Sequence, residues 1–174
     1  MHIGRKPVKA INIEDKISSK QKGYITESRV AELITLGSRG QLTCYTPDSD
    51  DDGIDIIVNL KGEFRTIYVQ VKSRFKLNKN KRFVQNVGLK TFKSHPSFYI
   101  IFMHFNPDDL EVDTVWLIPS EEFEKLAYFK SEGKSYKSFY RFNANPKSEI
   151  DRWAQFKVDK AFLGEELLRI CSGY

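Results

Sequence analysis

The fold of this chain is decided by residues 52–72, which read DGIDIIVNLKGEFRTIYVQVK. Two apolar runs, 54–60 and 65–72, are separated by Lys61-Gly62-Glu63. A linker this short between two strand-like runs is typical of a β-hairpin. Gly53 precedes the first run and permits a sharp turn into it. We therefore expect two adjacent strands in one sheet.

Asp55 is the unusual residue of the first strand. Its neighbours Ile54, Ile56 and Ile57 indicate burial on both faces. A carboxylate among isoleucines packs poorly, but it suits a hard cation that prefers oxygen ligands. The sequence thus makes Asp55 a candidate metal ligand.

The second strand brings an amide and an ammonium group together. Strand periodicity puts Gln70 and Lys72 on one face, and Val69 with Val71 on the other. The amide oxygen of Gln70 is a candidate metal ligand, and so is the carbonyl of Val71. Lys72 can place a positive charge beside the metal. The hairpin would bring these groups next to Asp55.

A helix is expected upstream, from Ser18 or Ser19 to Leu36, with Gly37 ending it. Gly23 lies inside this span, so a loose first turn, or a start nearer Thr26, is the alternative. At 100° per residue, Glu27 falls on one stripe with Val30, Ala31 and Ile34. In one interpretation Glu27 faces the sheet, so that Asp55, Gln70 and Lys72 converge beneath the helix. In the other, Glu27 lies at the edge of the stripe and reaches water.

The remaining pattern predicts an α/β fold, with a mixed central β-sheet flanked by helices. Further strands are expected at 41–45, 97–105 and 114–118, a helix from Pro119 or Ser120 to about 130, and a helical stretch from about 148 to 170 that is broken near Gly164. Residues 73–93 are assigned to loop, with room for a short strand or helix. We divide the chain into a basic arm at 1–17 and one domain at 18–174, with a core at 18–130 and a helical tail at 131–174.

Charge is distributed unevenly along the chain, whose formal net charge is +5. Residues 64–106 contain nine Lys or Arg residues and no acid. Just upstream are five carboxylates: Asp48, Asp50, Asp51, Asp52 and Asp55. This arrangement suits a metal beside a phosphate-binding surface, although a solvated acidic loop and an ordinary basic face would look the same.

Other classes of protein have little support. The two cysteines, Cys44 and Cys171, are far apart, and the three histidines show no ligand spacing. No signal-peptide pattern is seen, and the longest apolar run, 98–105, is too short to span a bilayer. We expect a soluble, cytoplasmic protein with no membrane partner.

The motifs together resemble the PD-(D/E)XK, or restriction-endonuclease-like, nuclease superfamily. They are Gly23-Tyr24-Ile25-Thr26-Glu27, Asp52-Gly53-Ile54-Asp55 and Val69-Gln70-Val71-Lys72, and the resemblance covers about residues 18–118. It implies a metal-dependent DNA endonuclease that uses Mg²⁺ or Mn²⁺. Asp55 and Gln70 would be metal ligands, Lys72 the catalytic lysine, and Glu27 the supporting carboxylate.

One departure from the family pattern is Gln70, which replaces the more usual acid. A glutamine coordinates magnesium without adding charge, so Glu27 or Asp52 would have to compensate. Two alternatives therefore stay open: a catalytically silent nuclease fold that binds nucleic acid, and a protein-interaction module. Cutting of both strands by a domain with one site would require a homodimer.

The expected DNA surface directly follows Lys72. It consists of the cations Arg74, Lys76, Lys79, Lys81 and Arg82, with Lys90 and Lys93 further on. Aromatic residues alternate with cations at 128–141, either as core residues or as platforms for unpaired bases, and we favour the core. Trp153 and Phe156 are expected in the core.

Overall fold

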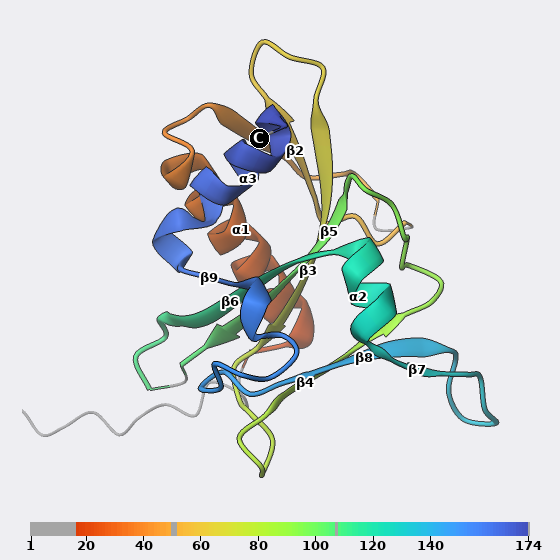
Figure 1. Ribbon diagram of the computed structural model, residues 1–174. Helices are drawn as coiled ribbons and strands as arrows, with labels where there is room; N and C mark the ends of the chain where they lie inside the picture. Colours follow the sequence, from red (N-terminus) through yellow and green to blue (C-terminus); the bar gives the residue numbers. More distant parts are fainter. Residues whose placement is uncertain (1–16, 50–51, 107, 174) are drawn as a thin grey trace, which may run out of the picture.

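The computed structural model describes residues 17–49, 52–106 and 108–173. The basic arm at 1–17 lies almost wholly outside the described residues, as do Asp50 and Asp51. A central sheet is covered by helices α1 and α3 on one side and by a small second sheet with helix α2 on the other (Figure 1). The elements in chain order are α1 (Ser19–Gly37), β1 (Leu42–Tyr45), β2 (Ile56–Leu60), β3 (Thr66–Arg74), β4 (Phe83–Gly88), β5 (Phe98–Phe105), β6 (Val112–Pro119), α2 (Ser120–Leu126), β7 (Tyr128–Lys130), β8 (Phe139–Ala144), η2 (Ala154–Phe156), β9 (Lys157–Val158), η3 (Lys160–Phe162) and α3 (Leu163–Ser172).

The first helix begins and ends where the sequence predicts. Ser18 caps it by accepting from the N–H of Gln21, whose side chain in turn accepts from the N–H of Ser18. At the other end Gly37 packs against Gly164 of α3, where an added Cβ would lie 2.9 Å from a backbone nitrogen. This glycine contact allows α1 and α3 to approach closely on one face of the sheet.

The central sheet is mixed, as predicted. Its strand order is β1-β2-β3-β5-β6-β9, with β3 and β5 parallel and the other neighbours antiparallel. All eight residues of β5 are buried, because this strand has neighbours on both edges and covering layers on both faces. The predicted α/β architecture is confirmed.

The two faces of the central sheet bury different side chains. Val30 and Ile34 of α1 pack with Val69 and Val71 of β3 on one face. The opposite face is rich in aromatic residues, including Phe102 of β5, which stacks on Phe142 of β8 with ring centroids 3.9 Å apart. The alternation along β3 therefore decides which residues face the helices and which face the second sheet.

The second sheet was only partly anticipated. Its order is β4-β8-β7, so residues 83–88, assigned mainly to loop, form one edge strand of it, and β8 is the central strand. The helix expected from Ser120 to about 130 ends at Leu126, and β7 follows. β4 and β8 lie about fifty residues apart in the chain, so neither contains a local signal for the pairing.

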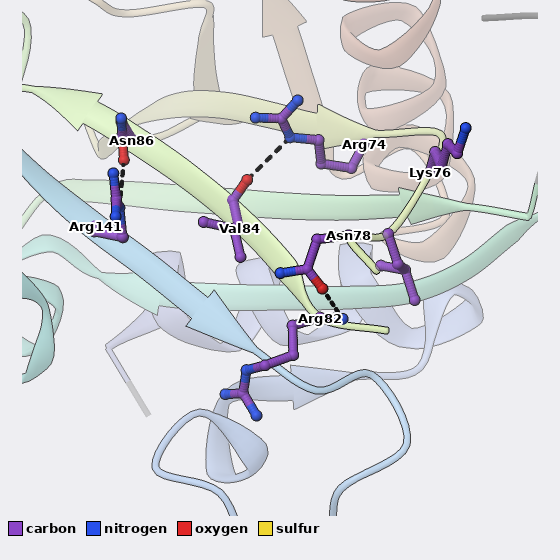
Figure 2. A pocket seen from close by; sticks show the side chains of 8 residues that line it. Arg74, Lys76, Asn78, Arg82, Val84, Asn86 and Arg141 are labelled. Atoms are coloured by element: carbon purple, nitrogen blue, oxygen red, sulfur yellow. Dashed lines mark hydrogen bonds between the residues drawn. The ribbon is translucent and has the colours of Figure 1, made fainter. Parts of the chain in front are cut away.

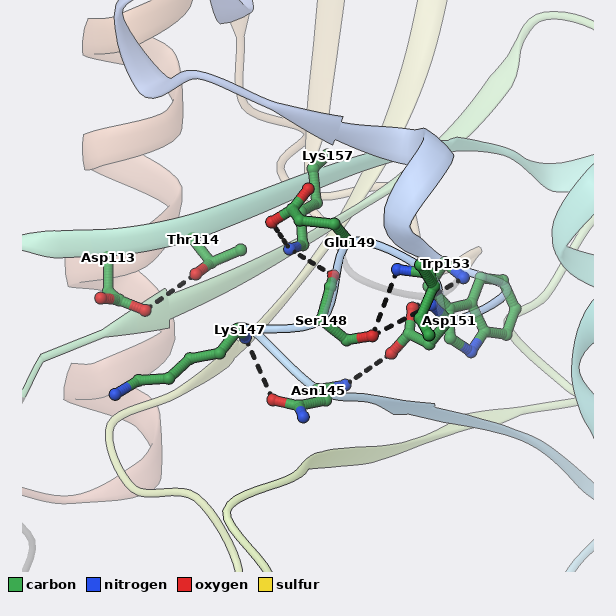
Figure 3. Close-up of polar contacts among 10 residues, drawn as sticks. Asp113, Thr114, Asn145, Lys147, Ser148, Glu149, Asp151, Trp153 and Lys157 are labelled. Carbon is green, nitrogen blue, oxygen red and sulfur yellow. Dashed lines mark hydrogen bonds and ion pairs between the residues drawn. The ribbon is translucent and has the colours of Figure 1, made fainter.

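The expected helical tail is the largest error. Within 131–173 only residues 163–172 form an α-helix, while 139–144 are strand and 145–153 are an irregular loop. Asp151 explains the loop, since its carboxylate accepts from the N–H groups of Asn145 and Trp153 and its own N–H donates to Ser148 Oγ (Figure 3). Such side-chain bonds to backbone compete with helical hydrogen bonds.

The same loop anchors Trp153 in the core. Trp153 is fully buried against Phe123 and Phe142, as expected, whereas Phe156 is only partly buried. Lys157 holds the loop from the other side by donating to the carbonyl of Ser148 at 2.7 Å (Figure 3).

Among the helices of the described residues, none combines the length and apolar character that a membrane span requires.

Candidate functional site

Asp55 lies against the strand that bears Gln70 and Lys72. Its N–H donates to the carbonyl of Val69 at 2.9 Å, and its Oδ2 accepts from the N–H of Val71 at 2.6 Å. β2 begins one residue later, at Ile56, which pairs with Val69. Beyond Val69, β3 continues to Arg74 and, among the described residues, pairs there only with β5. Asp55 therefore lies where β3 loses β2 as its strand neighbour.

Gln70 is buried next to Asp55, with 1% of its surface exposed. Its Nε2 lies 3.5 Å from Thr91 Oγ1, and Gly53 packs so tightly here that an added Cβ would lie 2.7 Å from Nε2. The Gln70 Oε1 atom is buried and has no hydrogen-bond partner among the residues that the structure describes. An unsatisfied buried acceptor costs about 1–3 kcal/mol, which a bound cation or water would relieve.

The predicted alternation along β3 is confirmed, but its direction relative to the helix was wrong. Val69 and Val71 pack under α1, whereas Tyr68, on the Gln70 and Lys72 side of the strand, packs with the aromatic core. Gln70 and Lys72 therefore face the second sheet and do not converge beneath the helix. The apolar stripe of α1 selects the valines because burying them favours folding.

Glu27 occupies the edge of the α1 stripe. The buried line on α1 is Thr26, Val30 and Ile34, and Glu27 is half-buried beside it. Thr26 donates to Ser73 Oγ at 2.8 Å, so this turn of the helix lies at the end of β3 that follows Lys72. The edge interpretation of Glu27 is the one that the structure supports.

The possible metal donors are mainly neutral oxygens. Within 17–49, 52–106 and 108–173, no group of three or more His, Cys, Asp or Glu side chains is placed to hold a metal. The Asp55 carboxylate contacts the backbone of Val71, and Gln70 directly precedes Val71 in β3. In a strand the N–H and C=O of one residue point the same way, so the Val71 carbonyl points toward the edge where Asp55 lies. The unsatisfied Gln70 oxygen fits a hard cation here.

The basic side chains after Lys72 line a groove of about 450 Å³ on the second sheet (Figure 2). Three of the five cations expected at the DNA surface, Arg74, Lys76 and Arg82, line it, while Lys79 and Lys81 do not. Sequence reasoning missed Arg141 and Asn86, which also line it. A signal was present, because residues 133–148 contain four cations and no acid.

The aromatic residues of 128–141 divide between core and surface. Phe139 is buried, as the core interpretation predicts, but Tyr128 is 62% exposed. Phe129 and Tyr136 are also exposed. The Lys130 ammonium lies 4.5 Å from the centre of the Tyr136 ring, so this cation and this exposed ring contact each other.

With this geometry, the chain can be compared with solved structures. It has the fold of a homing endonuclease. The match is to the bacterial homing endonuclease I-Ssp6803I, with a TM-score of 0.57 and 17% sequence identity. It covers 90% of this chain and 95% of that chain, so the likeness includes the tail as well as the central sheet.

No protein-family model matches the sequence, and comparison with curated proteins gives no match.

Proposed function

We propose that this chain is a metal-dependent DNA endonuclease of the PD-(D/E)XK class, with Gln70-Val71-Lys72 in place of the usual acid-x-Lys. The observation that carries the proposal is the pairing of Asp55 with the backbone of Val71, next to a buried Gln70 oxygen that lacks a hydrogen-bond partner. The Asp55 carboxylate, the Gln70 amide and the Val71 carbonyl would supply the oxygen donors, and Lys72 lies two residues after Gln70 on the same side of β3.

Each residue has a distinct role in the proposal. Asp55, Gln70 and the carbonyl of Val71 would hold Mg²⁺ or Mn²⁺, with Glu27 as an outer carboxylate. When bound, the metal would polarise the phosphoryl oxygen and make its bound water a stronger nucleophile. The Lys72 ammonium would offset negative charge on the transition state.

The choice of DNA rests on two further observations. A bacterial homing endonuclease has the same fold over 90% of this chain. A groove lined by four cations lies on the second sheet, toward which Lys72 faces. Cleavage of both strands would require two copies of the chain, whereas one copy would nick.

The test is cleavage of supercoiled plasmid with Mg²⁺, Mn²⁺ or EDTA. We expect nicked or linear product with either metal and none with EDTA. Asp55→Asn and Lys72→Met should each lower the rate at least a hundredfold. Asp108→Asn and Lys134→Met change the same charges at exposed positions and should cleave normally. Cleavage that persists in Asp55→Asn would rule out the assigned site.

The competing proposal is a nuclease fold that binds DNA without cutting it. Its support is that Gln70 is neutral and enclosed, so the site holds less charge than an acid-x-Lys pair would. In that case DNA affinity would be unchanged in Asp55→Asn and Lys72→Met, and no metal-dependent product would form. A Gln70→Glu variant that gained cleavage would show that only the charge was missing.

A further inference from the structure

We propose that the outer face of the β4–β8 pair is a preformed phosphate-binding groove that holds the sugar-phosphate backbone of duplex DNA. The proposal deepens the nuclease function and rests on it for the identity of the ligand. Its new element is β8, which supplies Arg141, a residue far in sequence from the basic segment after Lys72.

The groove forms because the fold pairs two acid-free segments of the chain. Residues 64–106 contain nine cations and no acid, and residues 133–148 contain Lys134, Lys137, Arg141 and Lys147 and no acid. β4 belongs to the first segment and β8 to the second, and they pair from Phe83–Ala144 to Gly88–Phe139. The pairing therefore brings Arg82 of the first segment and Arg141 of the second into one groove.

The arginines of the groove are held by neutral groups. Arg74 Nε donates to the carbonyl of Val84 at 3.0 Å, and Arg141 Nε donates to Asn86 Oδ1 at 2.9 Å (Figure 2). Arg82 donates from Nε to Asn143 Oδ1 and from Nη2 to the carbonyl of Asn143. Because these acceptors are uncharged, each guanidinium is oriented while its full charge is kept for an anion.

The lining of the groove favours the backbone of a duplex over unpaired bases. It consists of four cations, two asparagines and two aliphatic side chains, with no aromatic ring. Phe83 and Phe142 point the other way and are buried in the core, 5.5 Å apart, while Phe139, whose ring lies 5.1 Å from the Arg141 guanidinium, is also buried. Single-strand binding usually needs exposed rings for base stacking, whereas phosphate contacts need cations and amides.

The groove continues the candidate site along β3. Arg74 follows Lys72 by two residues on the same side of the strand, so their Cα atoms are about 7 Å apart by strand rise. A DNA strand lying in the groove would thus pass directly to Lys72. The groove would orient DNA while Asp55, Gln70 and Lys72 act on one phosphodiester.

The test is binding of a fluorescent 30-base-pair DNA duplex without divalent metal, over a series of NaCl concentrations. We expect Arg82→Gln/Arg141→Gln to bind at least tenfold more weakly than wild type. The slope of log affinity against log salt should fall in magnitude by about 2, because each lost phosphate contact removes about 0.9. The control Lys61→Gln/Lys134→Gln removes two exposed cations outside the groove and should keep the wild-type slope.

Equal losses in both double variants would overturn the groove and indicate diffuse attraction. Arg141→Lys, which keeps the charge, should lose less affinity than Arg141→Gln, and thermal melting would confirm that each variant is folded. Tighter binding to single-stranded RNA than to duplex DNA would also overturn the proposal. Salt-dependent binding at the groove without any cleavage would support the groove and refute the nuclease function. Cleavage that is unaffected by the arginine substitutions would support the nuclease function and refute the groove.

Discussion

The N–H of Val71 donates to the Oδ2 of Asp55 at 2.6 Å, so a carboxylate occupies the place of a backbone partner where β2 begins. The candidate metal ligand is thus also a structural residue that holds the strand bearing Gln70 and Lys72. A substitution at Asp55 tests function only if it keeps this hydrogen bond.

Asp55→Asn and Asp55→Ala should separate the two roles. Asparagine retains an oxygen that can accept from Val71, so we expect little change in the free energy of unfolding but a loss of metal-dependent cleavage. Alanine leaves the Val71 N–H without its acceptor, at a cost of about 1–3 kcal/mol. Urea denaturation and plasmid cleavage on both variants provide the measurement. Equal stability of the two variants would contradict the structural role.

Substitutions at Gln70 should show whether its Oε1 atom coordinates a cation. Gln70→Met removes the unsatisfied acceptor at similar volume, and we expect its free energy of unfolding to stay within about 1 kcal/mol of wild type. Gln70→Glu instead buries a carboxylate, which destabilises the fold without metal.

Thermal melting with and without Mg²⁺ tests whether residue 70 coordinates a cation. A ligand that binds only the folded state raises the melting temperature. We expect Mg²⁺ to raise it most in Gln70→Glu and not at all in Gln70→Met. No Mg²⁺ effect on Gln70→Glu would refute coordination at this position.

Gly53 should be far less tolerant of alanine than Gly62. Both have positive φ, +69° and +79°, but an added Cβ at Gly53 would lie 2.5 Å from Thr91, whereas at Gly62 nothing lies within 4 Å. Gly62→Ala should cost about 1–2 kcal/mol from backbone strain alone. Gly53→Ala should cost roughly 1–3 kcal/mol more from overpacking, measured by urea denaturation. Similar losses would contradict the close packing of Gly53 on Thr91 and Gln70.

Ionisation of the Cys171 thiol should lower the free energy of unfolding at high pH. Cys171 lies in α3 and faces the core, and this burial raises the pKa of its thiol from 9.0 to about 11, while the charge of Arg65 acts in the opposite direction. Since the folded pKa is the higher one, the stability that the protonated thiol contributes is fully present below pH 9.0 and is lost as pH rises toward 11. The difference in urea midpoint between wild type and Cys171→Ala should shrink over this range. Alkylation should reach the half-buried Cys44 before Cys171.

Local patterns sufficed for the helix and strands of residues 18–72. The capping residue Ser18, the stripe of Val30 and Ile34, and the alternation along β3 depend on neighbours within a few residues, and all are confirmed. The second sheet could not be predicted in this way. β4 and β8 stabilise each other only after folding, and Asp151 prevents a helix through bonds that the sequence pattern does not reveal.

By itself the sequence determined the mixed α/β fold and the alternation that puts Gln70 and Lys72 on one side of their strand, because strand and helix periodicities follow from backbone geometry. The tertiary structure decided that this side faces the second sheet and that Arg141 joins Arg74 and Arg82 in one groove. The reason is that burial and long-range strand pairing are properties of the whole chain, and they select among surfaces that local patterns leave equivalent.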